Sequence, residues 1–167
     1  MKFAALFSAG AILLSSAAGP ALLQAKTLEE LTKEAGSEWM IGKWASEDGS
    51  AQISYTWRLD KHAVAFTFKM GDRESEGMII RKPGTEDEVV YGSADNKGGV
   101  STGHWTEHNG HPTLIMKSVQ ADGTERKFAT EHIKTDADTM TVNLMGVGDD
   151  GKPDDSRLHE VIFKRQK

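Results

Sequence analysis

The sequence has no cysteine and only four prolines among its 167 residues. Without cysteine there is no disulfide framework, no lipid-modified cysteine and no thiolate chemistry, so the stability of the fold depends on its core. Lysine and arginine (20) are outnumbered by aspartate and glutamate (25), and they form no basic stripe. This acidic balance argues against nucleic acid as a partner, because phosphate binding requires clustered positive charge.

Long uncharged runs are also missing, except at the N-terminus. There Lys2 precedes an apolar run over residues 3–14, which is followed by small residues, the Gly19-Pro20 pair and Ala25. This order is typical of a secretory signal peptide. We therefore expect residues 1–25 to be removed by cleavage near Ala25. The product would be an exported protein, periplasmic or secreted, with no stable membrane insertion and with residues 26–167 as its single domain.

The remaining chain begins with a helical pattern and then changes period. Thr27 and Glu30 have the spacing of a capping box, and Leu28 and Leu31 follow at helical intervals, which predicts a short amphipathic helix. From Trp44 onward, apolar and polar residues alternate with a period of two, between turns rich in Gly, Asn and Asp. This pattern predicts ten strands: one around Trp44, then 52–59, 63–70, 77–81, 88–94, 100–107, 112–120, 125–134, 139–145 and 157–165.

Two turns fix which residues share a face of the sheet. Asn109-Gly110 favours a two-residue type I′ hairpin, which places Trp105 on the inner face of the sheet. Asp122-Gly123 instead suits a three-residue loop with a bulge, because that loop aligns Phe128 with Met116 on one apolar face.

An open sheet of ten amphipathic strands would expose two edges, and one helix cannot cover its whole apolar face. Closing the sheet into a barrel removes both edges, and the helix can then pack across one end. The short turns connect neighbouring strands. We therefore predict an all-β fold, an antiparallel up-and-down barrel of about ten strands with one short N-terminal helix.

The chain resembles a known group of barrels. Gly42-Lys43-Trp44 has the Gly-x-Trp element that opens the first strand of lipocalin and calycin barrels. The order of further motifs resembles exported bacterial lipocalin-like domains of unknown function over about residues 28 to 166: Gly98-Gly99 before a strand with Trp105, Asp122-Gly123, and Gly151-Lys152-Pro153-Asp154 before the last strand. The resemblance implies a fold. It also implies that Arg165 or Lys164 on the final strand stacks over Trp44.

A barrel of this size can enclose a small ligand. Our leading hypothesis is a non-enzymatic protein that binds an apolar or amphipathic small molecule. The residues expected to line the site are Tyr55, Trp57, Phe66, Phe68, Met78, Tyr91, Trp105, Met116, Phe128 and His132. In the alternative, the same residues fill a dry core and the protein acts through its surface.

Two histidines carry the remaining alternatives. His132 is expected to point inward, where it is either a hydrogen-bonded core histidine or orients a polar group of the ligand. In the catalytic alternative, His132 or His159 serves as the acid or base of an isomerase or cyclase. His159 on the final strand is similar in position to the proximal haem ligand of nitrobindins, and the resemblance implies haem as the candidate cofactor. No Gly-x-Ser-x-Gly motif, phosphate loop or dinucleotide fingerprint is present. We therefore expect no catalytic residues, and no metal apart from a haem iron at His159.

His108 and His111 flank the Asn109-Gly110 turn and would face each other across it. Two ligands without a third make a weak metal site, so we expect both side chains to be solvated.

Overall fold

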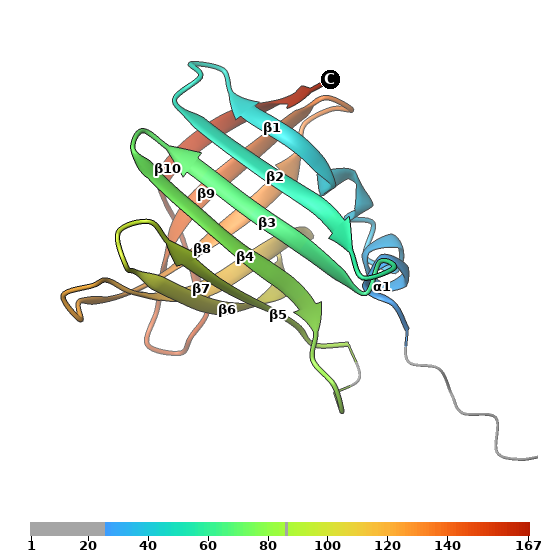
Figure 1. Cartoon of the computed structure of the whole chain (residues 1–167), viewed down its shortest axis with the longest axis horizontal. Helices are drawn as coiled ribbons and strands as arrows, with labels where there is room; N and C mark the ends of the chain where they lie inside the picture. Colours follow the sequence, from blue (N-terminus) through green and yellow to red (C-terminus); the bar gives the residue numbers. More distant parts are fainter. Residues whose placement is uncertain (1–25, 86) are drawn as a thin grey trace, which may run out of the picture.

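The computed structural model describes residues 26–85 and 87–167, which form a closed antiparallel β-barrel with short helices at one end (Figure 1). The elements are α1 (Leu28–Glu34), the 3₁₀ helix η1 (Glu38–Met40), β1 (Gly42–Ser46), β2 (Ala51–Arg58), β3 (Ala63–Met70), β4 (Arg73–Arg81), β5 (Val89–Asp95), β6 (Val100–His108), β7 (His111–Val119), β8 (Glu125–Lys134), β9 (Thr139–Val147) and β10 (Pro153–Gln166). Strands adjacent in sequence pair with each other, and β1 pairs with β10 to close the barrel. The predicted all-β barrel with one short α-helix is therefore confirmed.

The predicted signal peptide, residues 1–25, lies outside the described residues. Within the part of the chain that the structure describes, no helix has the length and apolar character needed to span a membrane.

Two strands begin earlier than the apolar pattern predicts. β4 starts at Arg73 rather than residue 77, and β10 starts at Pro153 rather than residue 157. The added part of β4 is polar, but it pairs residue by residue with the end of β3, from Lys69 opposite Glu74 to Met70 opposite Arg73. Backbone pairing continues there because the tight turn at Gly71 holds the two strands together.

The two registers predicted from the turns are confirmed. Asn109 and Gly110 both have positive φ (52° and 78°), as a type I′ turn requires, and His108 lies opposite His111. Trp105 consequently shares a face with Leu114, which is buried. At the next turn, three residues separate the hydrogen-bonded pair Gln120 and Thr124, and Phe128 lies opposite Met116.

The helix α1 is fixed to one end of the barrel (Figure 1). Thr27 and Glu30 form the predicted capping box, which satisfies free N–H groups at the start of the helix. The Glu29 backbone N–H donates to the Lys61 carbonyl oxygen (3.2 Å) in the β2–β3 turn, and the Lys61 Nζ lies 2.6 Å from Glu29 Oε1. Because Leu28 is 1% exposed, the apolar face of the helix is packed against the barrel.

The Gly-x-Trp element anchors the first strand to the last. Trp44 is buried, its indole N–H donates to the Met40 carbonyl oxygen (2.8 Å), and the Arg165 guanidinium lies 4.1 Å from the centre of its ring. Arg165 also donates to the carbonyl oxygens of Ile41 and Trp39. A Cβ atom on Gly42, which has φ 136°, would lie 2.6 Å from Arg165 Nη1, so this position requires glycine. The expected stacking over Trp44 is therefore made by Arg165.

Candidate functional site

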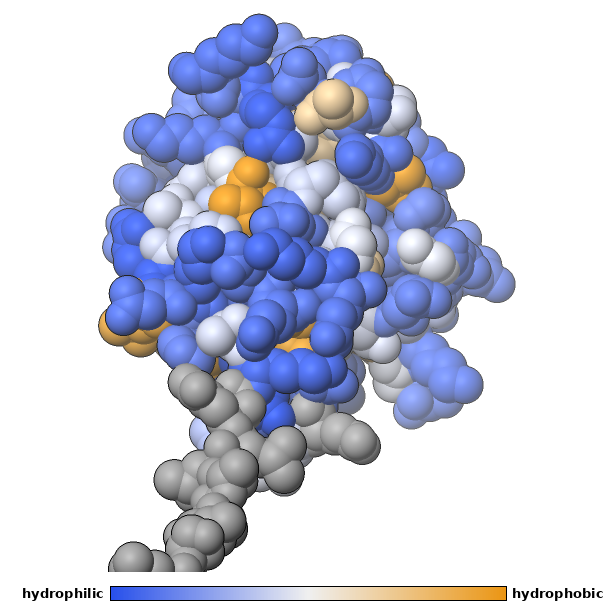
Figure 2. All heavy atoms as spheres, turned by 90° about the vertical axis from the view of Figure 1, so that its right-hand side faces the viewer, coloured by the Kyte–Doolittle hydropathy of each residue, from blue (hydrophilic) through white to orange (hydrophobic). Residues whose placement is uncertain are grey.

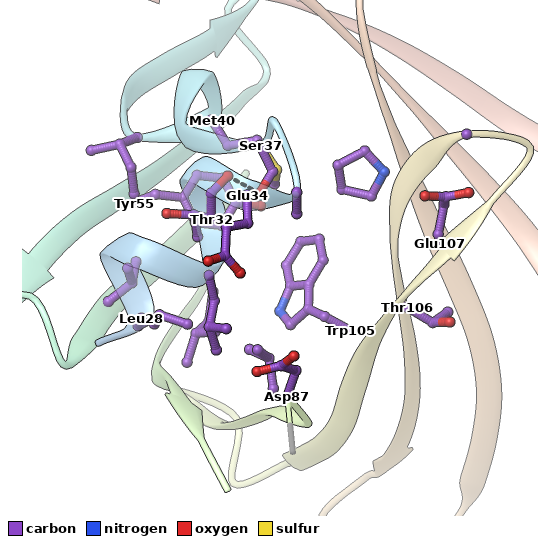
Figure 3. A pocket seen from close by; sticks show the side chains of 18 residues that line it. Leu28, Thr32, Glu34, Ser37, Met40, Tyr55, Asp87, Trp105, Thr106 and Glu107 are labelled. Carbon is purple, nitrogen blue, oxygen red and sulfur yellow. Dashed lines mark hydrogen bonds between the residues drawn. The ribbon is translucent and has the colours of Figure 1, made fainter. Parts of the chain in front are cut away.

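A cavity of about 340 Å³ lies beneath α1 and η1, at the end of the barrel; we call it the chamber. Its volume is within the range of small-molecule pockets, about 300 to 1,000 Å³. The wall is mainly apolar, with helix residues on one side and strand residues on the other (Figure 3). The apolar lining residues are Leu28, Leu31, Ala35, Met40, Ile41, Val64, Ile79, Val89 and Pro112, and the rings of Tyr55 and Trp105 complete the wall.

A layer of rings crosses the barrel interior next to the chamber. Ring centres are 5.1 Å apart for Trp105 and His132, 6.3 Å for His132 and Tyr55, 5.6 Å for Tyr55 and Phe66, and 5.3 Å for Phe66 and Tyr91. Tyr55 and Trp105 both line the chamber and belong to this layer, so we call it the aromatic floor. These rings pack against each other across the barrel interior, and the chamber lies at its α1 end.

His132 holds the aromatic floor in place through two hydrogen bonds. The Thr130 carbonyl oxygen can only accept, so His132 Nδ1 donates to it (3.1 Å). The His132 Nε2 atom then accepts from the Tyr55 hydroxyl (3.1 Å). Burial lowers the pKa of His132 to about 4 and raises that of Tyr55, so both groups are neutral at pH 7.

The polar part of the chamber lining includes three carboxylates. Glu34 comes from α1, Asp87 from the segment before β5, and Glu107 from the end of β6. Lys26 Nζ lies 2.7 Å from Glu34 Oε2. The surface around this end of the molecule is mostly hydrophilic, with small apolar areas (Figure 2). The chamber thus combines an apolar wall with acidic groups.

Trp105 has an indole nitrogen, Nε1, that is buried and has no hydrogen-bond partner in the protein. Leaving a buried donor unpaired costs about 1 to 3 kcal/mol. In Figure 3 the Trp105 indole lies in the middle of the view, between the side chains of Glu34 and Asp87 and that of Glu107. Other atoms of the Trp105 ring line the chamber, whereas the Nε1 atom itself is covered.

The structure brings together only part of the predicted lining. Tyr55 and Trp105 line the chamber. His132 is buried in the aromatic floor, and the other interior residues lie in the barrel core or beside it: Trp57, Phe66, Phe68, Tyr91 and Met116. Phe128 lies opposite Met116 on β8. The filled-core interpretation therefore describes the middle of the barrel, whereas the chamber is formed near the helix.

The expectation that Met78 faces the interior is wrong. Met78 is 36% exposed, whereas its neighbour Ile79 is 7% exposed and lines the chamber. The register explains the difference, because Val64 on the inner face of β3 lies opposite Ile79. Residues 78–80 are all apolar, so the sequence did not show which face of β4 points inward.

The lining predicted from the sequence included only strand residues, whereas α1 and η1 form one wall of the chamber. Leu28, Leu31 and Ala35 line the chamber from α1, and Met40 and Ile41 line it from η1 and the residue after it. The apolar spacing of 28, 31 and 35 was the available signal, since a helix that closes one end of a barrel must turn that face inward.

His159 is on β10, opposite Leu144 of β9, and its side chain is exposed. It does not line the chamber, and β10 has a register irregularity between Arg157 and His159. His159 therefore lies apart from the chamber, and haem ligation by this residue stays a prediction.

The paired histidines of the β6–β7 turn lie outside the barrel interior, but the expectation that both are solvated is wrong for His108, whose side chain is 17% exposed. His108 Nδ1 lies 3.2 Å from Glu131 Oε1, and Glu131 Oε2 accepts from Asn143 Nδ2 (2.9 Å). Glu131 and Asn143 are buried on the outer face, so this cluster ties β6, β8 and β9 together. Across residues 26–85 and 87–167, no group of three or more His, Cys, Asp or Glu side chains is arranged to hold a metal ion.

Comparison with protein-family models found no match for the chain, and comparison with curated proteins found none either.

Proposed function

We propose that this chain is an exported, lipocalin-like binding protein that holds one apolar or amphipathic small molecule in the chamber and catalyses no reaction. The observation that carries the proposal is the chamber itself, an apolar cavity of about 340 Å³ between α1 and the aromatic floor. An apolar wall of this size favours a ligand because removing apolar surface from water contributes about 25 cal/mol per Å².

The state of His132 favours binding over catalysis. Both of its ring nitrogens are engaged, and its low pKa keeps it neutral. It lies outside the chamber lining, where a group that transfers protons to a substrate would have to lie. Its observed contacts are those of a residue that positions Tyr55.

A neutral fluorescent dye, N-phenyl-1-naphthylamine, provides the test. We expect it to bind the intact domain with increased emission, and Ile79→Phe to weaken binding at least about tenfold because the added ring fills the chamber. Ile80→Phe is the matched control. It makes the same change of side chain on the outer face of the barrel, where Ile80 is 40% exposed. Leu31→Phe on α1 provides a second chamber-filling variant if Ile79→Phe does not fold.

The result that contradicts the proposal is equal dye binding by the domain and by both chamber-filling variants, or no binding at all. Native mass spectrometry of protein from its own exported compartment then identifies the natural ligand by its mass.

A further inference from the structure

The charged side chains in the chamber lining all have the same sign. They are Glu34, Asp87 and Glu107, and no lysine, arginine or histidine lies among the lining residues in 26–85 and 87–167. These carboxylates come from three separate segments of the chain, which the fold brings to one cavity. In the view of Figure 3, Glu34 and Asp87 lie on the same side of the Trp105 indole. We call these two carboxylates the acidic rim.

We propose that the chamber selects amphiphiles with a positively charged head group, such as an ammonium, which contacts the acidic rim while the apolar chain lies against Leu31, Val64 and Ile79. This inference rests on the proposed ligand-binding function and specifies the chemical class of its ligand. The cavity supplies the space for the chain, and the carboxylates supply the charge that the head group requires.

The protein already places one ammonium at the rim. Lys26 Nζ lies 2.7 Å from Glu34 Oε2, and both side chains are about half exposed. The hydrogen bond that Lys26 donates to Glu34 raises the pKa of Lys26, and the charges of Glu34 and Asp87 raise it further. The environment therefore favours a cation at this point. An exposed ion pair is weak, so a ligand ammonium can displace the Lys26 side chain.

An anionic head group would meet the opposite conditions. A sulfate or carboxylate entering the chamber would approach Glu34, Asp87 and Glu107, and among the described residues the nearby cation Lys26 is already paired with Glu34. The aromatic face of Trp105 adds to this preference, because indole rings attract cations. Fatty acids are accordingly the wrong class of amphiphile for this chamber.

The test compares three probes with the same ten-carbon chain and different heads: decyltrimethylammonium, decanol and decyl sulfate, each below its micelle concentration. Their affinities are measured by displacement of N-phenyl-1-naphthylamine from the intact domain. We expect the ammonium to bind at least about tenfold more tightly than the sulfate, with decanol between them. The preference should decrease in 0.5 M salt, because screening weakens the contribution of the rim.

Variants then assign the preference to the rim. We expect Glu34→Gln and Asp87→Asn each to reduce the ratio of ammonium to sulfate affinity severalfold. Asp122→Asn is the matched control, because it removes one carboxylate from the exposed β7–β8 turn and leaves the rim intact. Equal effects of the rim variants and the control would overturn the proposal.

The outcomes distinguish failure of the proposed ligand binding from failure of the proposed head-group selectivity. If the dye does not bind the intact domain, both the binding function and its charge preference are wrong. If the dye binds and none of the three probes displaces it, the proposed ligand class is wrong. If decanol and decyl sulfate displace it as well as the ammonium does, the chamber binds ligands but the proposed head-group selectivity is wrong.

Discussion

A single buried histidine makes the stability of the barrel depend on pH. His132 is 2% exposed, and its Nε2 accepts from the Tyr55 hydroxyl beside the chamber. Desolvation lowers its pKa to about 4 in the folded protein, against about 6.5 in the unfolded chain. Between these values the unfolded state binds more protons than the folded state. The stability from neutral His132 is therefore complete above pH 6.5 and is lost as the pH falls toward 4.

We predict that this one residue contributes roughly 3 kcal/mol to the loss of unfolding free energy between pH 7 and pH 4. The measurement is urea unfolding at several pH values for the native sequence and for His132→Gln, which keeps an acceptor for Tyr55. The variant should be less stable at pH 7, and its difference from the native sequence should shrink as the pH falls. His62→Gln, at an exposed position, serves as the control. A constant difference between His132→Gln and the native sequence would refute the prediction.

At the scale of secondary structure elements, the curvature of the barrel depends on glycine where strands approach closely. A Cβ atom on Gly103 of β6 would lie 2.3 Å from the Ile115 carbonyl oxygen on β7. That atom is backbone, so it cannot move without separating the two strands. A Cβ atom on Gly92 of the neighbouring strand β5 would have no other atom within 4 Å. Two glycines in adjacent strands thus have different roles, one permitting close contact and one in open space.

We predict that Gly103→Ala lowers the free energy of unfolding by about 1 to 3 kcal/mol, the usual cost of overpacking. Gly92→Ala is expected to be neutral or slightly stabilising, because alanine reduces the freedom of the unfolded chain. Chemical denaturation of the two variants measures both effects. Equal destabilisation by the two changes would show that the close approach of β6 and β7 has no energetic role.

The elements themselves were largely predictable from the sequence. Alternating residues gave the positions of the ten strands, and the Asn109-Gly110 turn gave the register that places Trp105 inside. The extended start of β4 was missed because its residues are polar and form a strand through backbone pairing. The face of Met78 was missed because three consecutive apolar residues leave the alternation undefined.

The candidate site was less predictable, because it belongs to the whole molecule. Inward-facing aromatic residues can either surround a cavity or pack against each other, and only the closed barrel shows that most of them pack. The acidic groups at positions 34, 87 and 107 are far apart in sequence and meet only when α1 lies across the end of the barrel. The local periodicity of the sequence does not show which distant residues line the same cavity.

The closure of the whole barrel depends on one short seam between its first and last strands. The four residue pairs between β1 and β10 all use residues 163–166, and they include Trp44 opposite Arg165 and Ser46 opposite Phe163. Loss of this seam would expose the edges of β1 and β10 and uncover Trp44, which is 1% exposed in the closed barrel. An unpaired edge of this kind favours association with other chains.

We predict that a chain ending at Ile162 loses the cooperative fold and the binding of N-phenyl-1-naphthylamine, because all pairs of the seam are removed together. A chain ending at Gln166 keeps every pair and should unfold like the full chain. Thermal unfolding followed by tryptophan emission compares the two, since exposure of Trp44 shifts emission to longer wavelength when the barrel opens. Size-exclusion chromatography shows whether the opened edge associates. A monomeric chain ending at Ile162 with an unchanged melting temperature would mean that the barrel is stable without its closing seam, and that the aromatic floor and α1 are sufficient to hold the two ends of the sheet together.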